Sequence, residues 1–221
     1  VDNNSSGRLR IDSGGRMDAE ISSRRLAIGE KYLRNLRLTF DNANGKLNGE
    51  LSCEDINLNA VQLKDNTISL FAEADNIGVG FRSDGDGDSK ASGGIYARGK
   101  LSRRDEGPLD MAVDILPSGF NIGEATWSIM PATVKFSGPD LKVDRLRITS
   151  GEQEILIDGG MAKEKNDTLS VRLENFSLAI ANLFTGKLEY GIQGNATGEA
   201  LIVSHPQAGQ QKGFLIDIVS D

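Results

Sequence analysis

The densest run of possible metal ligands in the sequence is Asp84-Gly-Asp-Gly-Asp88, whose spaced carboxylates resemble the opening of a calcium-binding loop. An EF-hand loop also needs flanking helices and a bidentate glutamate at its twelfth position, which Ile95 holds here. The stretch from Arg82 to Gly94 has the composition of an acidic surface connection. We therefore expect no metal site in this segment.

Hydrolytic chemistry lacks suitable residues. The single histidine, His205, lies in a Ser-His-Pro-Gln segment outside the alternating pattern, so neither a serine nor a cysteine nucleophile has an ordered base. Zinc needs more His or Cys than the chain contains. Cys53, the single cysteine, cannot form an intrachain disulfide and continues the apolar positions Leu47 and Leu51. This predicts a buried structural thiol.

Carboxylate pairs and an aromatic platform are the remaining enzymatic signals. Asp110, Asp114 and Asp144 occupy polar positions of alternating segments, where solvated carboxylates are expected. Trp127 is in register with Ala125 and Ile129, so we expect it on an apolar face rather than stacked on a sugar. We expect a protein without enzymatic activity, cofactor or metal, and keep a carbohydrate-active β-helix enzyme as an alternative.

The elements that position these residues are strands, because apolar residues recur at every second position along the chain. Leu36, Leu38 and Phe40 form one such set. Helical spacing occurs only between Leu178 and Phe184, where one or two turns are expected. Glycine-containing pairs predict tight turns between strands, among them Asn44-Gly45 and Gly159-Gly160. Short spacing between strands favours antiparallel connections.

Composition agrees with a sheet that is apolar on one face. Apolar residues make up 38% and aromatic residues 5% of 221 residues, which is little for a core enclosed on all sides. The net charge of -7 argues against a nucleic-acid partner. We predict an all-β fold built as an elongated, curved, mostly antiparallel one-sided sheet, with a β-sandwich as the alternative. Residues 1–221 are expected to form a single continuous domain. Because the chain begins at Val1 rather than Met, we expect it to be a fragment of a larger protein.

Residues 120–202 resemble the C-terminal portion of the TamB group within the AsmA-like superfamily of Gram-negative envelope proteins. The resemblance rests on runs such as Gly123-Glu-Ala-Thr-Trp-Ser-Ile-Met-Pro131 and Leu169-Ser-Val-Arg-Leu-Glu-Asn-Phe-Ser-Leu178. No equally good motif occurs in residues 1–118. The resemblance implies a U-shaped β-sheet, called a β-taco, with an apolar inner groove. It also implies a periplasmic location, with the parent protein anchored in the inner membrane, and no catalytic residues.

Two functions follow from this resemblance and from the one-sided strands. The first is a conduit that carries phospholipid or another apolar ligand between the inner and outer membranes. The second is an assembly module that binds outer-membrane proteins by β-strand addition, with an outer-membrane β-barrel as partner. A closed β-sandwich adhesin is the structural alternative, and the sequence leaves open whether the apolar face is a groove or a closed core. The residues predicted to face the groove are Ile129, Val134, Phe136, Leu146, Ile148, Ile155, Ile157, Val171 and Leu173.

Overall fold

Antiparallel strands make up most of the computed structural model, which describes residues 5–57, 62–85, 91–103, 109–181, 193–204 and 212–220. Within these residues, 16 strands belong to one sheet, and every pair of neighbours is antiparallel. The all-β, curved-sheet prediction is confirmed. The strands are β1 Ser5–Ile11, β2 Met17–Ile28, β3 Lys31–Asp41, β4 Lys46–Asn57, β5 Gln62–Glu73, β6 Asn76–Ser83, β7 Ala91–Arg103, β8 Leu109–Ile115, β9 Ser118–Ile122, β10 Ala125–Ile129, β11 Ala132–Ser137, β12 Asp140–Ser150, β13 Gln153–Met161, β14 Asp167–Ser177, β15 Asn195–Ser204 and β16 Lys212–Ser220.

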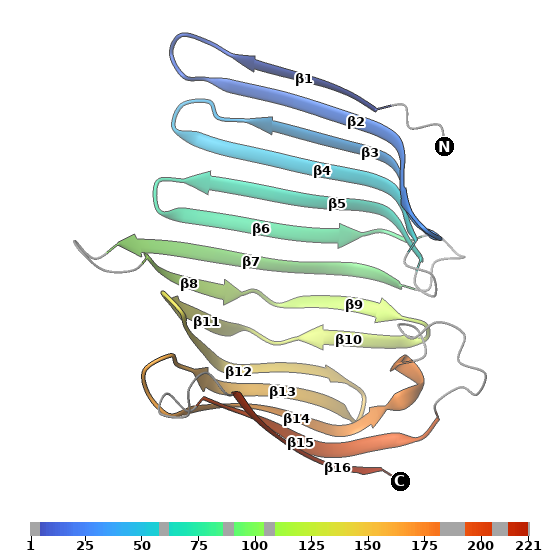
Figure 1. The fold of residues 1–221 in the computed structure, drawn as a ribbon. Coiled ribbons are helices and arrows are strands. Elements are labelled where there is room, and N and C mark those ends of the chain that lie inside the picture. The colour runs from blue at the N-terminus through green and yellow to red at the C-terminus, as the bar shows by residue number, and fades with distance from the viewer. Residues whose placement is uncertain are drawn as a thin grey trace.

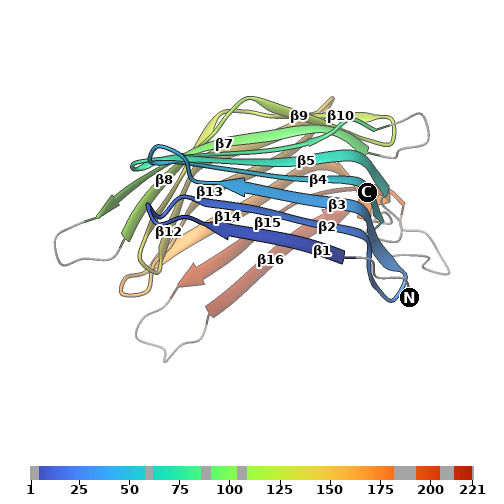
Figure 2. The same cartoon turned by 90° about the horizontal axis from the view of Figure 1, so that it is seen from above.

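The sheet is curved and has two open edges. Its order is β1-β2-β3-β4-β5-β6-β7-β8-β11-β12-β13-β14-β15-β16, with β9 and β10 pairing beside β7 and β12. Figure 1 places β1 and β16 at opposite ends of the sheet. Seen from above, both edge strands lie on one side of the view, whereas β7, β9 and β10 lie on the other (Figure 2). The strands therefore form one bent sheet, in place of the two separate sheets of a sandwich.

The turn predictions have mixed outcomes. Asn44 and Gly45 have φ angles of 55° and 74° and join β3 to β4, as predicted for a tight hairpin. The turn predicted at Gly159-Gly160 is wrong, because both residues lie inside β13. Gly159 has a φ of 101°, and a Cβ atom there would lie 2.2 Å from the carbonyl oxygen of Thr168 on β14. This glycine is therefore required by a close approach between two strands.

The helical spacing after β14 produces a single 3-10 turn, η1, Leu178–Ala181. Residues 182–184, which belonged to the same predicted helical segment, lie outside the described residues. No helix in the described part of the chain has the length and hydropathy needed to cross a membrane.

Two prolines interrupt two neighbouring strands at the same level of the sheet. Pro117 separates β8 from β9, and Pro131 separates β10 from β11. Strand β10 pairs with β9, and β11 pairs with β8. The amide of Leu116 donates to β7 and that of Met130 donates to β12, with N···O distances of 2.9 Å. Successive amides along a strand point in opposite directions. Pro117 and Pro131 therefore occupy positions whose amides would otherwise donate hydrogen bonds between the two interrupted strands. The hydrogen-bond ladder is therefore interrupted between them, while β7 and β12 run past on either side.

A second irregularity crosses β2 to β5, where these strands bend together (Figure 1). The ladder skips one residue in each strand along a single line: Arg24, Asn35, Glu54 and Asp65. Asn35 and Asp65 have φ angles of 51° and 50°. This left-handed region is one that Asn and Asp tolerate better than most residues.

Small polar side chains bind carbonyl groups beside this bend. Cys53 Sγ donates to the Arg34 carbonyl oxygen at 3.3 Å, Asn66 Nδ2 to the Cys53 carbonyl at 3.2 Å, and Ser83 Oγ to the Lys64 carbonyl at 3.0 Å. Cys53, Asn66 and Ser83 are buried, as predicted for the thiol. Burial raises the pKa of the Cys53 thiol, which keeps it protonated and unreactive. These contacts satisfy backbone groups that the bend separates from the regular ladder.

A buried carboxylate links three strands at the same bend. Asp55 on β4 is 1% exposed, and its Oδ1 lies 2.5 Å from Lys64 Nζ on β5. Its Oδ2 is ion-paired with Arg34 on β3. Arg34 also lies 2.8 Å from Glu54 Oε1. A carboxylate removed from water is stable only with such partners.

Replacing Asp55 with Asn keeps the side-chain shape and removes the charge between Lys64 and Arg34. We expect Asp55→Asn to lower the free energy of unfolding by about 2–3 kcal/mol, because one broken buried pair costs about 3–5 kcal/mol and half-exposed Arg34 regains hydration. Urea unfolding followed by circular dichroism measures this change.

Glu54→Gln is the matched control, since Glu54 is the neighbouring residue, pairs with the same arginine and is exposed. We expect this control to change the free energy of unfolding by less than about 0.5 kcal/mol. Equal losses in the two variants would mean that Asp55 contributes no more than a surface charge.

Candidate functional site

All nine residues predicted to face the groove lie on one face of the sheet. Residues paired directly across an antiparallel ladder share a face. One ladder row joins Ile129, Ile148, Ile155 and Leu173, and a second joins Leu146, Ile157 and Val171. Val134 and Phe136 pair with Val143 and Leu141 of β12 and so extend the same face. A bulge between Val143 and Leu146, where Arg145 has a φ of 46°, keeps both apolar residues on that face.

The apolar face continues without interruption into the N-terminal half. Leu38 pairs with Leu51, Leu51 with Ile68, and Ile68 with Phe81, across β3 to β6. Farther along the strands, Val79 pairs with Ala97, which pairs with Ile115 and through it with Ala132. These rows connect the N-terminal strands to the nine predicted residues. We call the whole surface the inner face, and the opposite surface the outer face.

Away from the bend, no described element covers the inner face over β2 to β7. Ile68 is 40% exposed and Val79 is 45% exposed, values typical of a surface rather than a packed core. Other large apolar side chains of this face are also exposed, namely Leu9, Ile11, Ile21, Leu70 and Ile95. A contiguous apolar surface of this kind marks a binding site in many soluble proteins.

Near the C-terminal half the sheet curls toward the inner face. Trp127 on β10 and Phe176 on β14 have ring centroids 6.0 Å apart, although β12 and β13 lie between their strands. Three strand spacings on a flat sheet would separate them by roughly 14 Å. Ile129, two residues beyond Trp127, is only 6% exposed. The inner face is therefore the concave side of this bend, and it shelters the residues within it.

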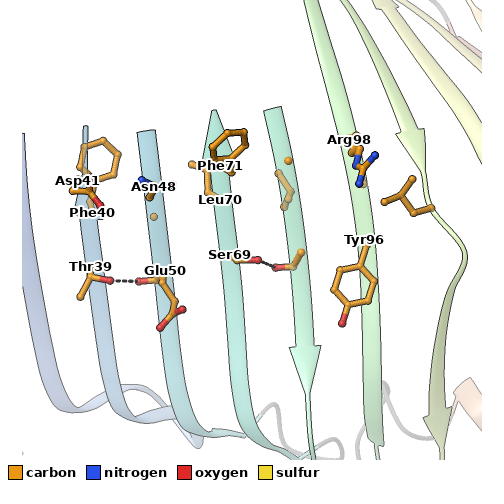
Figure 3. A pocket seen from close by; sticks show the side chains of 16 residues that line it. Thr39, Phe40, Asp41, Asn48, Glu50, Ser69, Leu70, Phe71, Tyr96 and Arg98 are labelled. Atoms are coloured by element: carbon orange, nitrogen blue, oxygen red, sulfur yellow. Dashed lines mark hydrogen bonds between the residues drawn. The ribbon is translucent and has the colours of Figure 1, made fainter. Parts of the chain in front are cut away.

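The outer face carries a different depression of about 460 Å³ over β3 to β7 (Figure 3). Its floor includes Gly80, whose missing side chain leaves room for the ring of Tyr96: a Cβ atom there would lie 3.0 Å from Tyr96 Cδ1. Glu50, Phe71 and Arg98 also line it. It is shallow and lies on the opposite side of the sheet from the inner face, so it is not part of the groove.

The candidate carboxylates of β8 and β12 lie on the outer face. Asp114 accepts a hydrogen bond from Thr133 Oγ1 at 2.8 Å, and Asp110 accepts one from Ser137 Oγ at 2.6 Å. Asp144 pairs with Thr133 across the ladder, so it lies two strands from Asp114. His205, Asp86 and Asp88 lie outside the described residues. Within the described residues, no group of three possible ligands could hold a metal.

Two parts of the inner face were not predicted from the sequence. The N-terminal rows show the required signal, which is alternation with period two. They have no family resemblance, so the sequence analysis predicts no groove residues in residues 1–118. Phe120 and Phe176, the aromatic neighbours of Trp127, were also missed. Phe176 lies next to Asn175, which has a φ of 49° in a bulged segment of β14. A bulge of this kind cannot be located from apolar spacing alone.

Comparison of the chain with protein-family models, with curated proteins and with solved structures gives no match.

Ile68→Asp tests whether the N-terminal part of the inner face binds apolar molecules. Because Ile68 is 40% exposed, we expect the variant to stay folded, with a loss of about 1 kcal/mol in the free energy of unfolding. We expect it to bind an apolar fluorescent dye such as ANS about fivefold more weakly, which corresponds to about 1 kcal/mol of lost apolar contact. Fluorescence titration measures both affinities.

Thr67→Asp is the control for this experiment, because the neighbouring residue on the same strand points to the outer face beside Arg82. We expect it to leave dye binding unchanged. If both variants lose the same affinity, the dye does not distinguish the two faces and the inner face is not its site.

Proposed function

We propose that this chain is a surface that binds the acyl chains of phospholipids and conducts them along the sheet, across its strands. The observation that carries the proposal is a ladder row that crosses the sheet from β4 to β15 without a charged residue. Its members are Leu47, Ala72, Ile77, Gly99, Val113, Val134, Val143, Gly159, Leu169 and Ile202.

The length and chemistry of this row suit hydrocarbon. Nine strand spacings give a path of roughly 40 Å, longer than the ~30 Å hydrocarbon core of a bilayer. Each methylene group removed from water contributes about 0.8 kcal/mol, so an acyl chain is held without a specific contact. A uniform row offers similar affinity at successive positions. A molecule can then move along it without meeting a deep minimum.

The setting we propose is the periplasm, with the parent protein anchored in the inner membrane and phospholipid passing to the outer membrane. The resemblance of residues 120–202 to the TamB group supports this setting. The exposed apolar rows of the N-terminal half support a role for that half in the same path.

Ile148→Asp combined with Ile157→Asp tests the conduit. Each substitution places a carboxylate on the inner face, in the two ladder rows of predicted groove residues. A charge beside hydrocarbon is strongly unfavourable, so we expect the rate of fluorescent phospholipid transfer between vesicles to fall about tenfold or more. The measurement is dequenching of the lipid in acceptor vesicles.

Leu156→Asp is the matched control, because Leu156 lies on the same strand but points to the outer face between Arg147 and Arg172. We expect it to transfer lipid at the unaltered rate. Unfolding of the double variant, checked by circular dichroism, would indicate a closed core. A folded double variant with full transfer activity would rule out this path.

Strand addition is a second candidate, because β1 is an unprotected edge. Within the described part of the chain it pairs only with β2, all seven of its residues are exposed, and it contains no proline. Edges of this kind bind extended peptides through backbone hydrogen bonds.

A photo-crosslinker at Arg10 tests this second function, with Arg37 on the internal strand β3 as the control position. We expect a β-hairpin peptide from an outer-membrane protein to crosslink at Arg10 and not at Arg37, because β1 lies at an edge of the sheet whereas β3 is paired on both sides. Equal labelling at both positions would show that the edge has no part in binding.

A further inference from the structure

Three aromatic rings form a cluster on the inner face. Trp127 on β10 lies opposite Phe120 on β9, with ring centroids 6.3 Å apart and planes 9° from parallel. Phe176 on β14 lies 6.0 Å away with its plane tilted by 51°. The indole is 2% exposed, whereas Phe120 and Phe176 are both half-buried. The cluster adjoins the predicted groove, because Ile129 lies two residues from Trp127 on the same face and pairs with Ile148.

The indole N–H of Trp127 is buried and has no hydrogen-bond partner among the described residues. A buried tryptophan usually directs this group to an acceptor, because an unsatisfied buried donor is destabilising. The indole N–H can only donate, so whatever satisfies it must present an oxygen or another acceptor. A purely hydrocarbon ligand cannot do so.

The surroundings restrict the kind of acceptor. The aromatic neighbours of the indole, the rings of Phe120 and Phe176, carry no charge to balance a phosphate. An ionised group beside these rings would lose hydration without compensation. A neutral carbonyl next to a hydrocarbon chain suits both the aromatic walls and the unpaired donor. An acyl ester has this combination.

We propose that Trp127 Nε1 donates a hydrogen bond to the ester carbonyl of a diacyl lipid whose chains lie on the inner face. The inference rests on the proposed function and assigns the groove a subsite for the ester linkage. Access to Nε1 then requires a ring of the cluster to move, and Phe176 is the ring carried by β14, a strand that does not neighbour β10. Phe120 stays stacked on the opposite strand and continues to support the indole.

The test compares two lipids that differ only at the carbonyl. A short-chain diacyl phosphatidylcholine and its dialkyl ether analogue, both below their micelle concentrations, compete with a fluorescent acyl probe for the folded chain. We expect the ester lipid to bind about fivefold to tenfold more tightly, the factor that one net hydrogen bond supplies. Trp127 is the single tryptophan, so its emission should also respond to the ester lipid.

Trp127→Phe supplies the matched variant, because it keeps an aromatic ring and removes the N–H. We expect it to bind the ether lipid with unchanged affinity and to lose the preference for the ester. Equal affinity of the two lipids for the unaltered chain overturns this inference and leaves the proposed function in place. Failure of both lipids to displace the probe overturns the proposed function itself. Because the comparison on the unaltered chain needs no variant, a Trp127→Phe chain that fails to fold does not affect the test.

Discussion

The antiparallel hydrogen-bond ladder is the interaction on which this structure depends, because no second layer of described residues packs against most of the sheet. In a two-layer protein, burial between the layers fixes each strand. Here the backbone bonds to two neighbours fix it, and side-chain burial is partial along the inner face. This explains how apolar residues such as Ile68 and Val79 remain exposed in a stable sheet. The same arrangement leaves one face available to an apolar ligand.

Because the ladder holds the sheet together, backbone groups left unpaired at its irregularities need other hydrogen-bond partners. At the bend across β2 to β5, the thiol, amide and hydroxyl groups of Cys53, Asn66 and Ser83 bind carbonyls along the line where the pairing is skipped. Asp55 connects Arg34 and Lys64 across three strands at the same place. At Pro117 and Pro131 the repair is different, since the neighbouring strands β7 and β12 continue past the interruption. Curvature is thus produced at a few defined lines, and regular pairing is retained between them.

Much of the fold was predictable, because alternation with period two defines both a strand and its two faces. It placed Ile129, Ile148, Ile157 and the other predicted groove residues on one surface, where the ladder rows now join them. The bends were not predictable from alternation. At such a line the apolar spacing lengthens from two to three, as between Leu33 and Leu36, and in a sequence this looks like the end of a strand.

The buried charge of Asp55 and the role of Gly159 were also beyond the sequence. In the sequence, Glu54-Asp55 looks like an ordinary solvated pair. The burial of Asp55 is set by cations on two other strands, which only the register brings together. Gly159 resembled a turn residue because glycine serves both turns and close strand approaches. Whether the groove is used by lipid is a property of the surface and its surroundings, so no local pattern could decide it.

The strand order has a consequence for how this molecule forms and for how its size can change. From β1 to β8 each strand pairs with the next in the chain, so the contacts are local in sequence and every hairpin can form next to one already made. The free energy of folding is then a sum of contributions from pairs of neighbouring strands, as it is from neighbouring units in repeat proteins. Inserting or deleting one hairpin in this region would lengthen or shorten the sheet by two strands. The side chains along the remaining rows would be unaltered. The length of the sheet can therefore change while the chemical character of its two faces stays the same.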